Sequence, residues 1–335
     1  MTDNIAPLIA ANLSKSYGER TVVAEASLSL QPGEITALVG GSGAGKSTLL
    51  RLLAGMERPD SGTVHSGDTM LSGPSQHMPP ELRRIGLIFQ DFALFPHLDV
   101  TRNIMFGLGH LPKQQRENVA ARWLSALNLG HRSQAYPHHL SGGEQQRVAI
   151  ARALAPEPVA ILMDEPFSGL DPELREHARE VTLSAIRNAH TPALMVTHDA
   201  SEALGHADQI AIMREGRILQ TGSAEQVYTQ PTNLAVTKAL GPVQEVQKSQ
   251  LPTAWHAQLA DAETLYLRPE AIRLDPSSQI SLKVANARRT GALTIITFVE
   301  GDGALTAAMI LATTPQPGET LPVSIDQSSV FTFLA

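Results

Sequence analysis

Cysteine is absent from the 335-residue sequence. Disulfide cross-links, thiolate-bound zinc and a cysteine nucleophile are therefore excluded. Histidine occurs 12 times, but no H-x-x-x-H pair stands in a stretch with helical periodicity. The sequence therefore offers no helix-borne histidine pair of the kind that binds zinc.

Long apolar runs are missing as well. No run approaches the roughly 20 residues that a membrane-crossing helix needs. The first residues, MTDNIAPLIA, lack a basic start followed by a long apolar stretch, so we expect no signal peptide. We therefore expect a cytoplasmic chain that would serve a membrane only through a partner that spans it.

Blocks of one charge sign are also lacking. The formal net charge is −7, and the charged residues are spread along the chain. This argues against nucleic acid as the main partner, because phosphate binding requires a basic surface. Hydrophobic residues make up 42% and charged residues 18%, which suits a chain with a buried core. We find no internal repeat and no low-complexity tract.

Short apolar runs and helical patterns alternate over the first 240 residues. Continuous apolar runs are typical of strands that are covered on both faces, as in a parallel sheet. The expected strands are 21–30, 35–39, 159–163 and 193–197, and the expected helices are 49–56, 143–154 and 172–189. Strands that alternate with helices predict an α/β domain over residues 1–240.

The pattern changes near residue 240. Short segments rich in Val, Ile and Thr follow, separated by Gly and Pro, at 265–267, 280–284, 293–299, 305–311 and 321–325. Little of this region has helical periodicity. We therefore expect a second, all-β domain over residues 241–335, built as a small barrel.

A glycine-rich segment follows the expected strand 35–39. Residues 40–48 read GGSGAGKST, which fits the phosphate-loop pattern G-x-x-x-x-G-K-S/T. Glycines let successive N–H groups face phosphate oxygens, and the helix that follows adds its positive N-terminal dipole end. Lys46 can reach the β- and γ-phosphates, and the Ser47 hydroxyl can ligate Mg²⁺. The sequence thus predicts, in place of a plain flexible turn, a nucleotide site made of Gly40, Gly41, Ser42, Gly43, Ala44, Gly45, Lys46, Ser47 and Thr48.

Two carboxylates end the apolar run 159–163. Asp164 and Glu165 would lie at the carboxyl edge of the sheet, where open α/β sheets bind their ligands. Asp164 would hold Mg²⁺, and Glu165 would polarise the water that attacks the γ-phosphate. An ordinary helix or turn start with acidic residues is the alternative, and the phosphate loop favours the catalytic interpretation.

A second candidate anion site lies upstream of the acidic pair. Residues 140–147 read LSGGEQQR, in which Ser141 and two glycines open an expected helix. This segment resembles the signature motif of ABC transporter ATPases. The resemblance implies that Ser141, Gly142 and Gly143 bind the γ-phosphate of a nucleotide held by a second subunit. Two chains would then pair head to tail around two ATP molecules. An ordinary helix cap with a solvated polar face is the alternative.

Four further positions match that family one by one. Tyr17 resembles the aromatic residue that stacks on adenine, and Gln90 resembles the glutamine that touches Mg²⁺ and the attacking water. Asp171 lies in a segment that resembles the loop crossing the dimer interface. His198 resembles the switch histidine that contacts the γ-phosphate. A strand-edge tyrosine and a structural histidine are the plain alternatives for two of them.

Two glycines depart from the family's usual pattern. Gly41 stands where many relatives carry Pro, Ala or Ser, and Gly169 stands where Ala is usual. Both exchanges loosen the backbone but leave the chemical groups intact. They bear on rate and coupling more than on activity itself. The resemblance covers residues from about 8 to 235 and implies the P-loop nucleotide-binding fold with a helical subdomain.

The branch of the family is indicated by residues outside these motifs. Residues 90–98 (QDFALFPHL) and 267–270 (LRPE) resemble importers of the spermidine, sulfate, sugar and ferric-iron type. The second stretch looks like the start of an oligomer-binding-fold (OB-like, TOBE-type) regulatory module. The stretches 101–104 with 106–109, 135–140 and 216–221 are most similar to ferric-iron import ATPases. Ferric iron is the expected solute, and spermidine, sulfate or thiosulfate, sugar and phosphonate stay open.

The resemblance also implies partners and a location. The chain would use ATP and Mg²⁺ as a homodimer, peripheral to the cytoplasmic face of the inner membrane. It would contact transmembrane permease subunits near residues 90–98 and serve a periplasmic or extracellular solute-binding protein indirectly. In that loop, Phe92, Phe95 and Leu98 could line a groove for a helix of the membrane subunit, although such side chains usually pack inward.

Three rival interpretations remain to be weighed. A soluble ABC ATPase of DNA repair or translation usually carries a coiled-coil insertion or a second ATPase domain, and the sequence has neither. An exporter ATPase is disfavoured by the β-rich tail with its LRPE stretch. A nucleotide-dependent regulatory protein with a ligand-binding tail is the alternative from another class.

Overall fold

The computed structural model describes residues 6–170, 172–300 and 303–333 of the chain. These divide into two compact units, Met1–Val227 and Tyr228–Ala335. The division lies before residue 240, where the composition of the sequence changes. Within the second unit, the guanidinium of Arg268 lies over the ring of Tyr228, 3.8 Å from Cζ to the ring centroid. The domain limits 1–240 and 241–335 stay a prediction.

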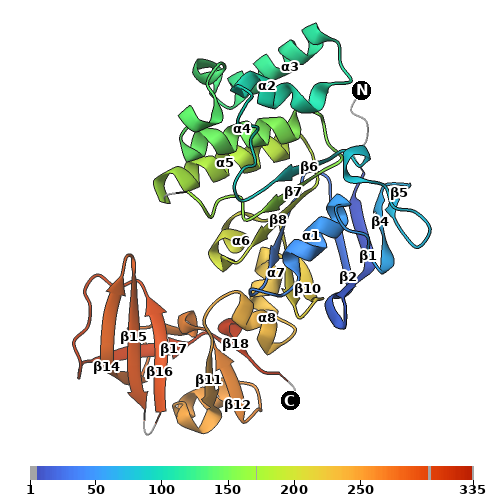
Figure 1. The fold of residues 1–335 in the computed structure, drawn as a ribbon. Helices are drawn as coiled ribbons and strands as arrows, with labels where there is room; N and C mark the ends of the chain where they lie inside the picture. Colours follow the sequence, from blue (N-terminus) through green and yellow to red (C-terminus); the bar gives the residue numbers. More distant parts are fainter. Residues whose placement is uncertain (1–5, 171, 301–302, 334–335) are drawn as a thin grey trace. The chain divides into compact units, whose positions relative to one another are not determined.

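A six-stranded, mostly parallel sheet forms the centre of the first unit (Figure 1). Its order is β10 (Arg217–Ser223), β9 (Gln209–Arg214), β3 (Ile35–Val39), β8 (Ala193–Thr197), β7 (Ala160–Asp164) and β6 (Ile85–Ile88). Only the β9–β10 pair is antiparallel. β3 and β8 are buried along their whole length, as expected for continuous apolar runs covered on both faces.

A second, antiparallel sheet lies in the same unit. Its order is β2 (Arg20–Leu30), β1 (Leu8–Tyr17), β4 (Ser61–Ser66) and β5 (Thr69–Ser72). The sequence indicated only β2. The pairing of β1 with β2 shifts register after Ala10, Leu13 and Lys15. Such bulges break the two-residue alternation by which a half-buried strand is found in a sequence.

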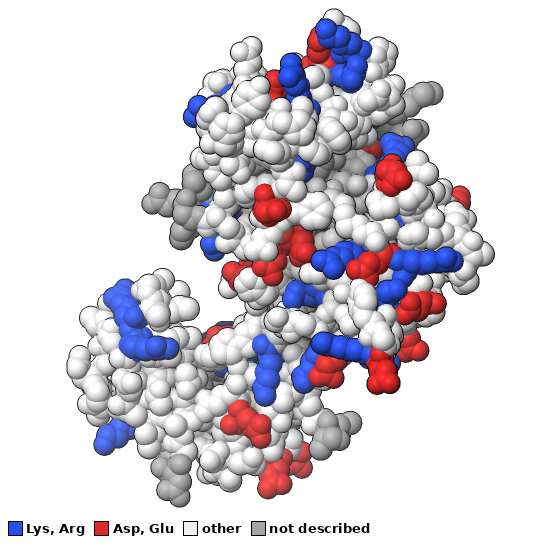
Figure 2. All heavy atoms as spheres, viewed as in Figure 1, with Lys and Arg blue, Asp and Glu red and all other residues white. Residues whose placement is uncertain are grey.

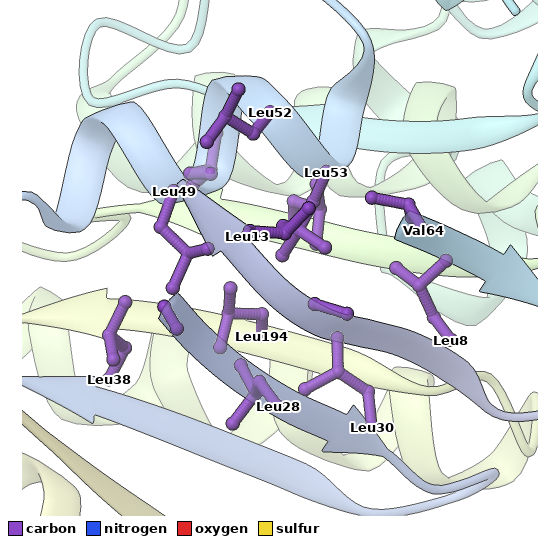
Figure 3. Packing of buried hydrophobic residues seen from close by; sticks show 14 of the residues in the cluster. Leu8, Leu13, Leu28, Leu30, Leu38, Leu49, Leu52, Leu53, Val64 and Leu194 are labelled. Atoms are coloured by element: carbon purple, nitrogen blue, oxygen red, sulfur yellow. The ribbon is translucent and has the colours of Figure 1, made fainter. Parts of the chain in front are cut away.

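Helix α1 (Lys46–Ala54) lies in the core between these sheets (Figure 3). Its Leu49, Leu52 and Leu53 pack in one cluster with leucines of β1, β2, β3 and β8. Burial of this size stabilises by roughly 1.5–3 kcal/mol for each leucine. Because its apolar side chains are fixed on both sides, α1 presents its N-terminus, next to residues 40–45, in one orientation.

The remaining helices of the unit gather mainly beside β6 and β7 (Figure 1). They are α2 (Val100–Met105), α3 (Lys113–Ala126), α4 (Gly142–Leu154) and α5 (Pro172–Asn188), with α6 (Ala200–His206) farther along the chain. The division between the units falls within α7 (Ala224–Thr229). Short 3₁₀ turns span Pro80–Leu82, Phe106–Leu108, Gly130–Arg132 and Pro137–His139. On the face of this unit drawn in Figure 2, acidic and basic side chains are interspersed, in keeping with the modest net charge of −7.

The second unit contains α8 (Leu234–Ala239) near its start and is otherwise mainly β-structure. One sheet has the order β11 (Gln244–Gln247), β12 (Thr264–Leu267) and β18 (Val330–Phe331). The other has the order β13 (Ile272–Leu274), β17 (Thr320–Ile325), β14 (Ser281–Thr290), β15 (Leu293–Glu300) and β16 (Gly303–Met309). Short 3₁₀ turns span Lys248–Gln250, Thr253–Gln258, Pro269–Ala271 and Gln327–Ser329. A core around the buried Trp255 and Phe298 joins the sheets.

Candidate functional site

Four loops meet at the carboxyl edge of the six-stranded sheet. They follow β3, β8, β7 and β6, which are neighbours in the sheet in that order and run parallel. Parallel neighbours end at the same edge, so the loops after them lie side by side. These loops carry the phosphate-loop residues after β3, His198 after β8, Glu165 after β7 and Gln90 after β6.

The loop after β3 curls around its own lysine. Lys46 is buried, and its Nζ donates hydrogen bonds to the carbonyl oxygens of Gly40 (2.7 Å) and Gly41 (3.1 Å). Burial lowers the pKa of Lys46, while the carboxylates of Glu165 and Asp164 act in the opposite direction. The lysine is therefore held at the loop and interacts electrostatically with the acidic pair.

Close backbone packing explains two of the loop's glycines. A Cβ on Gly40 would lie 2.3 Å from the carbonyl oxygen of Met213, and one on Gly45 would lie 2.5 Å from that of Val22. Gly45 also has a φ of 104°. In contrast, a Cβ on Gly41 would meet no atom within 4 Å. The space around Gly41 would therefore accommodate a small side chain, such as the Ala or Ser that many relatives carry there.

Alanine at these two neighbouring glycines should have opposite outcomes. In Gly40→Ala, the new Cβ pushes the phosphate loop away from the carbonyl oxygen of Met213. This should lower the unfolding free energy by about 2 kcal/mol. The displaced loop should also lose about tenfold in MgATP affinity. Gly41→Ala is the matched control and should bind as wild type. Titration with a fluorescent ATP analogue and urea unfolding test both, and equal behaviour of the two variants would contradict this account.

The acidic pair lies where the sequence suggested. Asp164 ends β7 and is half-buried, and burial raises its pKa, against a hydrogen bond with Ser47 that lowers it. The next residue, Glu165, has a φ of 46°. Its Oε1 lies 3.0 Å from Nδ1 of His198. The structure therefore joins residues of three loops, since Ser47 reaches Asp164 and Glu165 reaches His198.

A small pocket opens beside this pair. It has a volume of about 180 Å³ and is lined by Glu165, Phe167, Ser168, Arg175, Arg179, Thr197, His198, Asp199 and Glu202. The His198 side chain is 62% exposed, and that of Glu165 is 26% exposed. Both groups can therefore meet a solvent-borne substrate. Asp171 lies outside the described residues, and Gly169 before it is exposed.

Tyr17 ends β1 on the neighbouring antiparallel sheet. The residue is 47% exposed, and its hydroxyl donates a hydrogen bond to Glu57. That bond raises the pKa of Tyr17, and a contact with Thr48 of the phosphate loop lowers it. Thus the tyrosine has an exposed ring next to the loop, which is what stacking on a base requires.

Gln90 is exposed and lies just after β6. It begins a loop that is anchored by a buried side chain. Phe92 in this loop is buried, in a cluster with Ala149, Leu170 and Ala178. The suggestion that Phe92 lines an outer groove is therefore wrong, because its side chain fills the space between helices. Phe95 and Leu98 are half-buried.

The segment of residues 140–147 forms a capped helix start. Ser141 is the N-cap of α4, and its hydroxyl accepts a hydrogen bond from the Glu144 amide at 3.3 Å. The Glu144 carboxylate accepts in turn from the Ser141 amide (2.8 Å) and from Nε of Arg132 (2.8 Å). Gly142 and Gly143 follow on the first turn. In the described part of the chain, the polar partners of Ser141 are thus in its own turn and not in the phosphate loop.

Glu144 makes the signature helix sensitive to acid. Burial would raise its pKa, but the Ser141 amide and Arg132 together lower the pKa to about 2 from 4.5. A carboxylate with a depressed pKa stabilises the fold above about pH 4.5, and this stability is lost as the pH falls towards 2. The contribution is about 3 kcal/mol.

We therefore expect Glu144→Gln to weaken the dependence of the unfolding free energy on pH below about pH 5. The wild type should lose unfolding free energy between pH 5 and about pH 3, whereas the variant should be less stable at pH 7 and lose less over that interval, because Asp60, Asp275 and Asp326, whose pKa values are also lowered, still titrate. Urea unfolding at several pH values measures this. Glu117→Gln, at a more exposed ion pair with Lys113 on α3, is the control and should follow the wild type. Parallel curves for wild type and Glu144→Gln would contradict the assignment.

Two contacts of α4 were not apparent in the sequence. The buried Gln146 donates to the carbonyl oxygen of Pro166, next to Glu165, at 3.2 Å. Arg152 donates to the carbonyl oxygens of Phe92 (2.9 Å) and Ala93 (2.6 Å), in the loop that Gln90 begins. One helix therefore holds both the loop of the acidic pair and the loop of Gln90. Neither residue type nor spacing signals such a contact in advance.

This combination of a phosphate loop, an acidic pair and a capped signature helix defines the class of the protein. The ABC transporter family pattern matches residues 23–168, and the TOBE domain pattern matches residues 265–333. The chain belongs to the ABC transporter family and is the ATP-hydrolysing subunit of an importer. The predicted fold class, P-loop ABC domain and OB-like TOBE-type domain, is thereby confirmed.

Curated relatives of several kinds resemble the chain. The Fe(3+) ions import ATP-binding protein FbpC of Haemophilus influenzae (strain 86-028NP) is 35% identical, over 97% of this chain and 98% of the relative. The sulfate/thiosulfate import ATP-binding protein CysA of Neisseria meningitidis serogroup A is 36% identical, over 87% and 86%. The putrescine transport ATP-binding protein PotG of Escherichia coli (strain K12) is 42% identical, over 69% and 61%.

One solved structure has a fold similar to that of this chain. It is the ATP-binding cassette MJ0796 in a dimeric post-hydrolysis state bound to ADP and Pi, with a TM-score of 0.57 and 29% identity. The similarity covers 65% of this chain and 98% of that one. Cassettes of this family thus form dimers with nucleotide. In the described part of our chain, every helix is too short or too polar to cross a bilayer.

Proposed function

We propose that the chain couples hydrolysis of MgATP to the import of ferric iron. Iron is supported by the ferric-iron relatives from Haemophilus influenzae, which match 97% of the chain against 87% for the sulfate relative. Two other ferric-iron relatives, from Pectobacterium atrosepticum and Pseudomonas fluorescens, match 68% of it, close to the 69% of the putrescine relative. Sulfate, thiosulfate and polyamines are the competing solutes, because their transporters' ATPases are as similar in identity.

In this proposal the loop of residues 40–48 binds the triphosphate of ATP. Its N–H groups and the N-terminus of α1 face the phosphates, and Lys46 neutralises the β- and γ-phosphates. The tight packing behind Gly40 and Gly45 supports this role, since it fixes the curl of the loop. The exposed ring of Tyr17 stacks on adenine.

Mg²⁺ fits the oxygen groups beside the loop. Ser47, Asp164 and Gln90 offer a hydroxyl, a carboxylate and an amide oxygen, which are ligands that Mg²⁺ accepts directly or through water. Burial raises the pKa of Asp164, so a bound cation would favour its charged form. When bound, the ion supplies charge neutralisation at the phosphates.

Glu165 acts as the base for the attacking water. His198 lies within hydrogen-bond distance of it and steadies its carboxylate. Glu165 follows β7 with a φ of 46°, a backbone angle that L residues seldom adopt. His198 itself contacts the γ-phosphate.

A second copy of the chain completes each ATP site. Ser141, Gly142 and Gly143 of that copy cap the γ-phosphate, and Asp171 lies in the loop between the two copies. Hydrolysis then reopens the dimer. The dimeric MJ0796 cassette supports this arrangement.

Gln90 and its loop pass the opening and closing to permease subunits, which places the dimer on the cytoplasmic face of the inner membrane. The hold of Arg152 on this loop supports the role, because a loop fixed to α4 moves with it. A solute-binding protein outside the membrane delivers the cargo to the permease.

Uptake by intact cells tests the proposed solute. Cells that carry either wild type or the Lys46→Ala variant are given labelled Fe³⁺, sulfate and a polyamine in parallel. We expect iron uptake to collapse in the variant while the other two are unchanged. Unchanged iron uptake together with a loss of sulfate or polyamine uptake would refute the iron assignment and leave the ATPase assignment intact.

A further inference from the structure

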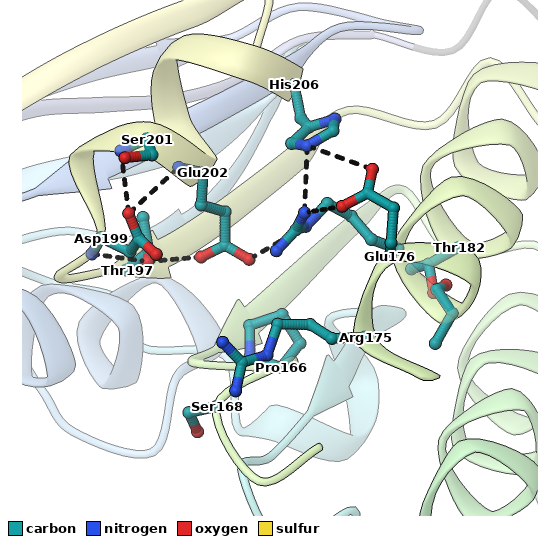
Figure 4. Close-up of polar contacts among 12 residues, drawn as sticks. Pro166, Ser168, Arg175, Glu176, Thr182, Thr197, Asp199, Ser201, Glu202 and His206 are labelled. Atoms are coloured by element: carbon teal, nitrogen blue, oxygen red, sulfur yellow. Dashed lines mark hydrogen bonds and ion pairs between the residues drawn. The ribbon is translucent and has the colours of Figure 1, made fainter. Parts of the chain in front are cut away.

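A network of charged side chains contacts Thr197 and Asp199, the two neighbours of His198 in the sequence (Figure 4). Its centre is Arg179 on α5, which is 8% exposed, and Glu202 on α6, which is 7% exposed. Nε of Arg179 lies 3.4 Å from Oε1 of Glu202. Both residues also line the pocket that Glu165 and His198 share. The network is thus continuous with the proposed catalytic site.

On one side, the network fixes both neighbours of His198. The second carboxylate oxygen of Glu202 accepts a hydrogen bond from the hydroxyl of Thr197, the last residue of β8. The same hydroxyl accepts a hydrogen bond from the Asp199 amide at 3.0 Å. Because the residues before and after His198 are both held by this chain of contacts, the direction of its side chain depends on Glu202.

On the other side, Arg179 reaches the strand end that carries Glu165. Its guanidinium lies over the ring of Phe167, 5.5 Å from the centroid, and Phe167 is buried just after Glu165. Nη1 of Arg179 also donates to Glu176 at 2.6 Å and lies 3.1 Å from Nε2 of His206. The Arg179 guanidinium therefore contacts both Glu202, which bonds to the neighbour of His198, and Phe167, which follows Glu165.

Stability alone does not explain a buried ion pair at this position. Desolvation of two charges offsets much of their attraction, and an apolar pair of similar volume is often as stable. What an apolar pair lacks is the directed oxygen that Thr197 needs. Placement of a reacting group within about 1 Å can change a rate by about 100-fold.

We propose that Arg179 and Glu202 are positioning residues that hold His198 against Glu165 in the hydrolytic site. The inference rests on the proposed function, because it requires these two groups to act on the γ-phosphate and its water. Its distinctive consequence is a loss of turnover without a loss of ATP binding, since Arg179 and Glu202 lie behind the pair and not in the phosphate loop.

The test replaces the ion pair by an apolar pair, Arg179→Met with Glu202→Leu, in the full chain. We expect kcat for ATP to fall about tenfold while the Kd for MgATP and the thermal midpoint stay close to wild type. Arg187→Met is the matched control, because it removes the exposed ion pair of the same helix with Asp208 and should leave kcat unchanged. If the paired variant does not fold, Thr197→Val is judged by the same measurements, because it removes the hydroxyl that joins Glu202 to the Asp199 amide.

A double-mutant cycle with His198→Ala distinguishes an effect that acts through the position of His198 from a general loosening of the site. If Arg179 and Glu202 act through His198, their replacement should have no further effect on kcat in the His198→Ala background. Additive losses, or an unchanged kcat in the paired variant, would overturn the inference while leaving the proposed function in place. A full kcat in His198→Ala alone would overturn both the inference and the role given to His198.

Discussion

Glu165→Gln should lower kcat for ATP hydrolysis about 100- to 1,000-fold, because it removes the base that takes a proton from the attacking water. The phosphate loop is untouched, so the Kd for MgATP should stay within about twofold of wild type. The neutral amide keeps the shape of the side chain and can still bond to His198, 3.0 Å away in the wild type. Steady-state phosphate release and equilibrium nucleotide binding measure the two quantities.

Glu157→Gln is the matched control for that variant. Glu157 also has a positive φ, of 53°, but it is exposed and lies before β7, at the opposite end of the strand from Glu165. Its replacement should leave kcat unchanged. A Glu165→Gln protein that turns over ATP within a few-fold of wild type would show that another group acts as the base.

Arg83→Met should destabilise the protein by about 4 kcal/mol, because it strips partners from several buried oxygens at once. Arg83 is only 2% exposed, and among the described residues it has no carboxylate partner. Its guanidinium instead donates to backbone carbonyls and a hydroxyl: Leu52 (3.1 Å), Leu53 (2.8 Å), Leu71 (3.2 Å), Met78 (2.7 Å) and Ser72 (2.5 Å). Burial lowers the pKa of Arg83 to about 10, so the group is still charged near neutral pH.

The position of Arg83 explains why the effect should be large. Leu52 and Leu53 are in the last turn of α1, where the carbonyls carry the negative end of the helix dipole. A Cβ at Gly55 would lie 2.1 Å from Nε of Arg83, so the chain passes directly over the guanidinium. Loss of this contact frees the C-terminus of the helix whose N-terminus borders the phosphate loop.

Thermal unfolding measures the loss, with an expected decrease in midpoint of about 10 °C. Arg84→Met is the control at the next residue. Arg84 is exposed and donates one hydrogen bond, to the carbonyl oxygen of Glu157, so its loss should cost at most about 0.5 kcal/mol. Equal midpoints for the two variants would contradict the role assigned to Arg83.

The sequence predicts the site best where spacing alone defines the chemistry. The loop of residues 40–48 and the pair Asp164–Glu165 both follow buried apolar strands, and the parallel order of those strands brings the loops to one edge. Ser141 and its two glycines predict the start of a helix, and α4 begins there with Ser141 as its N-cap, while the anion site at this helix start stays a prediction. In each case the signal is local, so a single stretch of sequence contains it.

The remaining features depend on contacts between distant segments. Bulges in β1 hide its alternation, and the register of the antiparallel sheet follows from pairing with strands elsewhere in the chain. The inward direction of Phe92 is set by α4 and α5, which only the folded chain brings together. Arg83 and Arg179 look like surface arginines in the sequence, because nothing near them along the chain announces their buried partners.

Cross-linking between two copies tests the central claim of a shared ATP site most directly. The chain has no cysteine, so Ser42→Cys, in the exposed part of the phosphate loop, and Ser141→Cys can each be introduced as the one thiol in its protein. Both are made in the Glu165→Gln background, mixed, and treated with a short thiol cross-linker. We predict a linked heterodimer that forms with MgATP and not without it. A mixture that yields no nucleotide-dependent heterodimer, while a single chain with both cysteines links within itself, would contradict the claim.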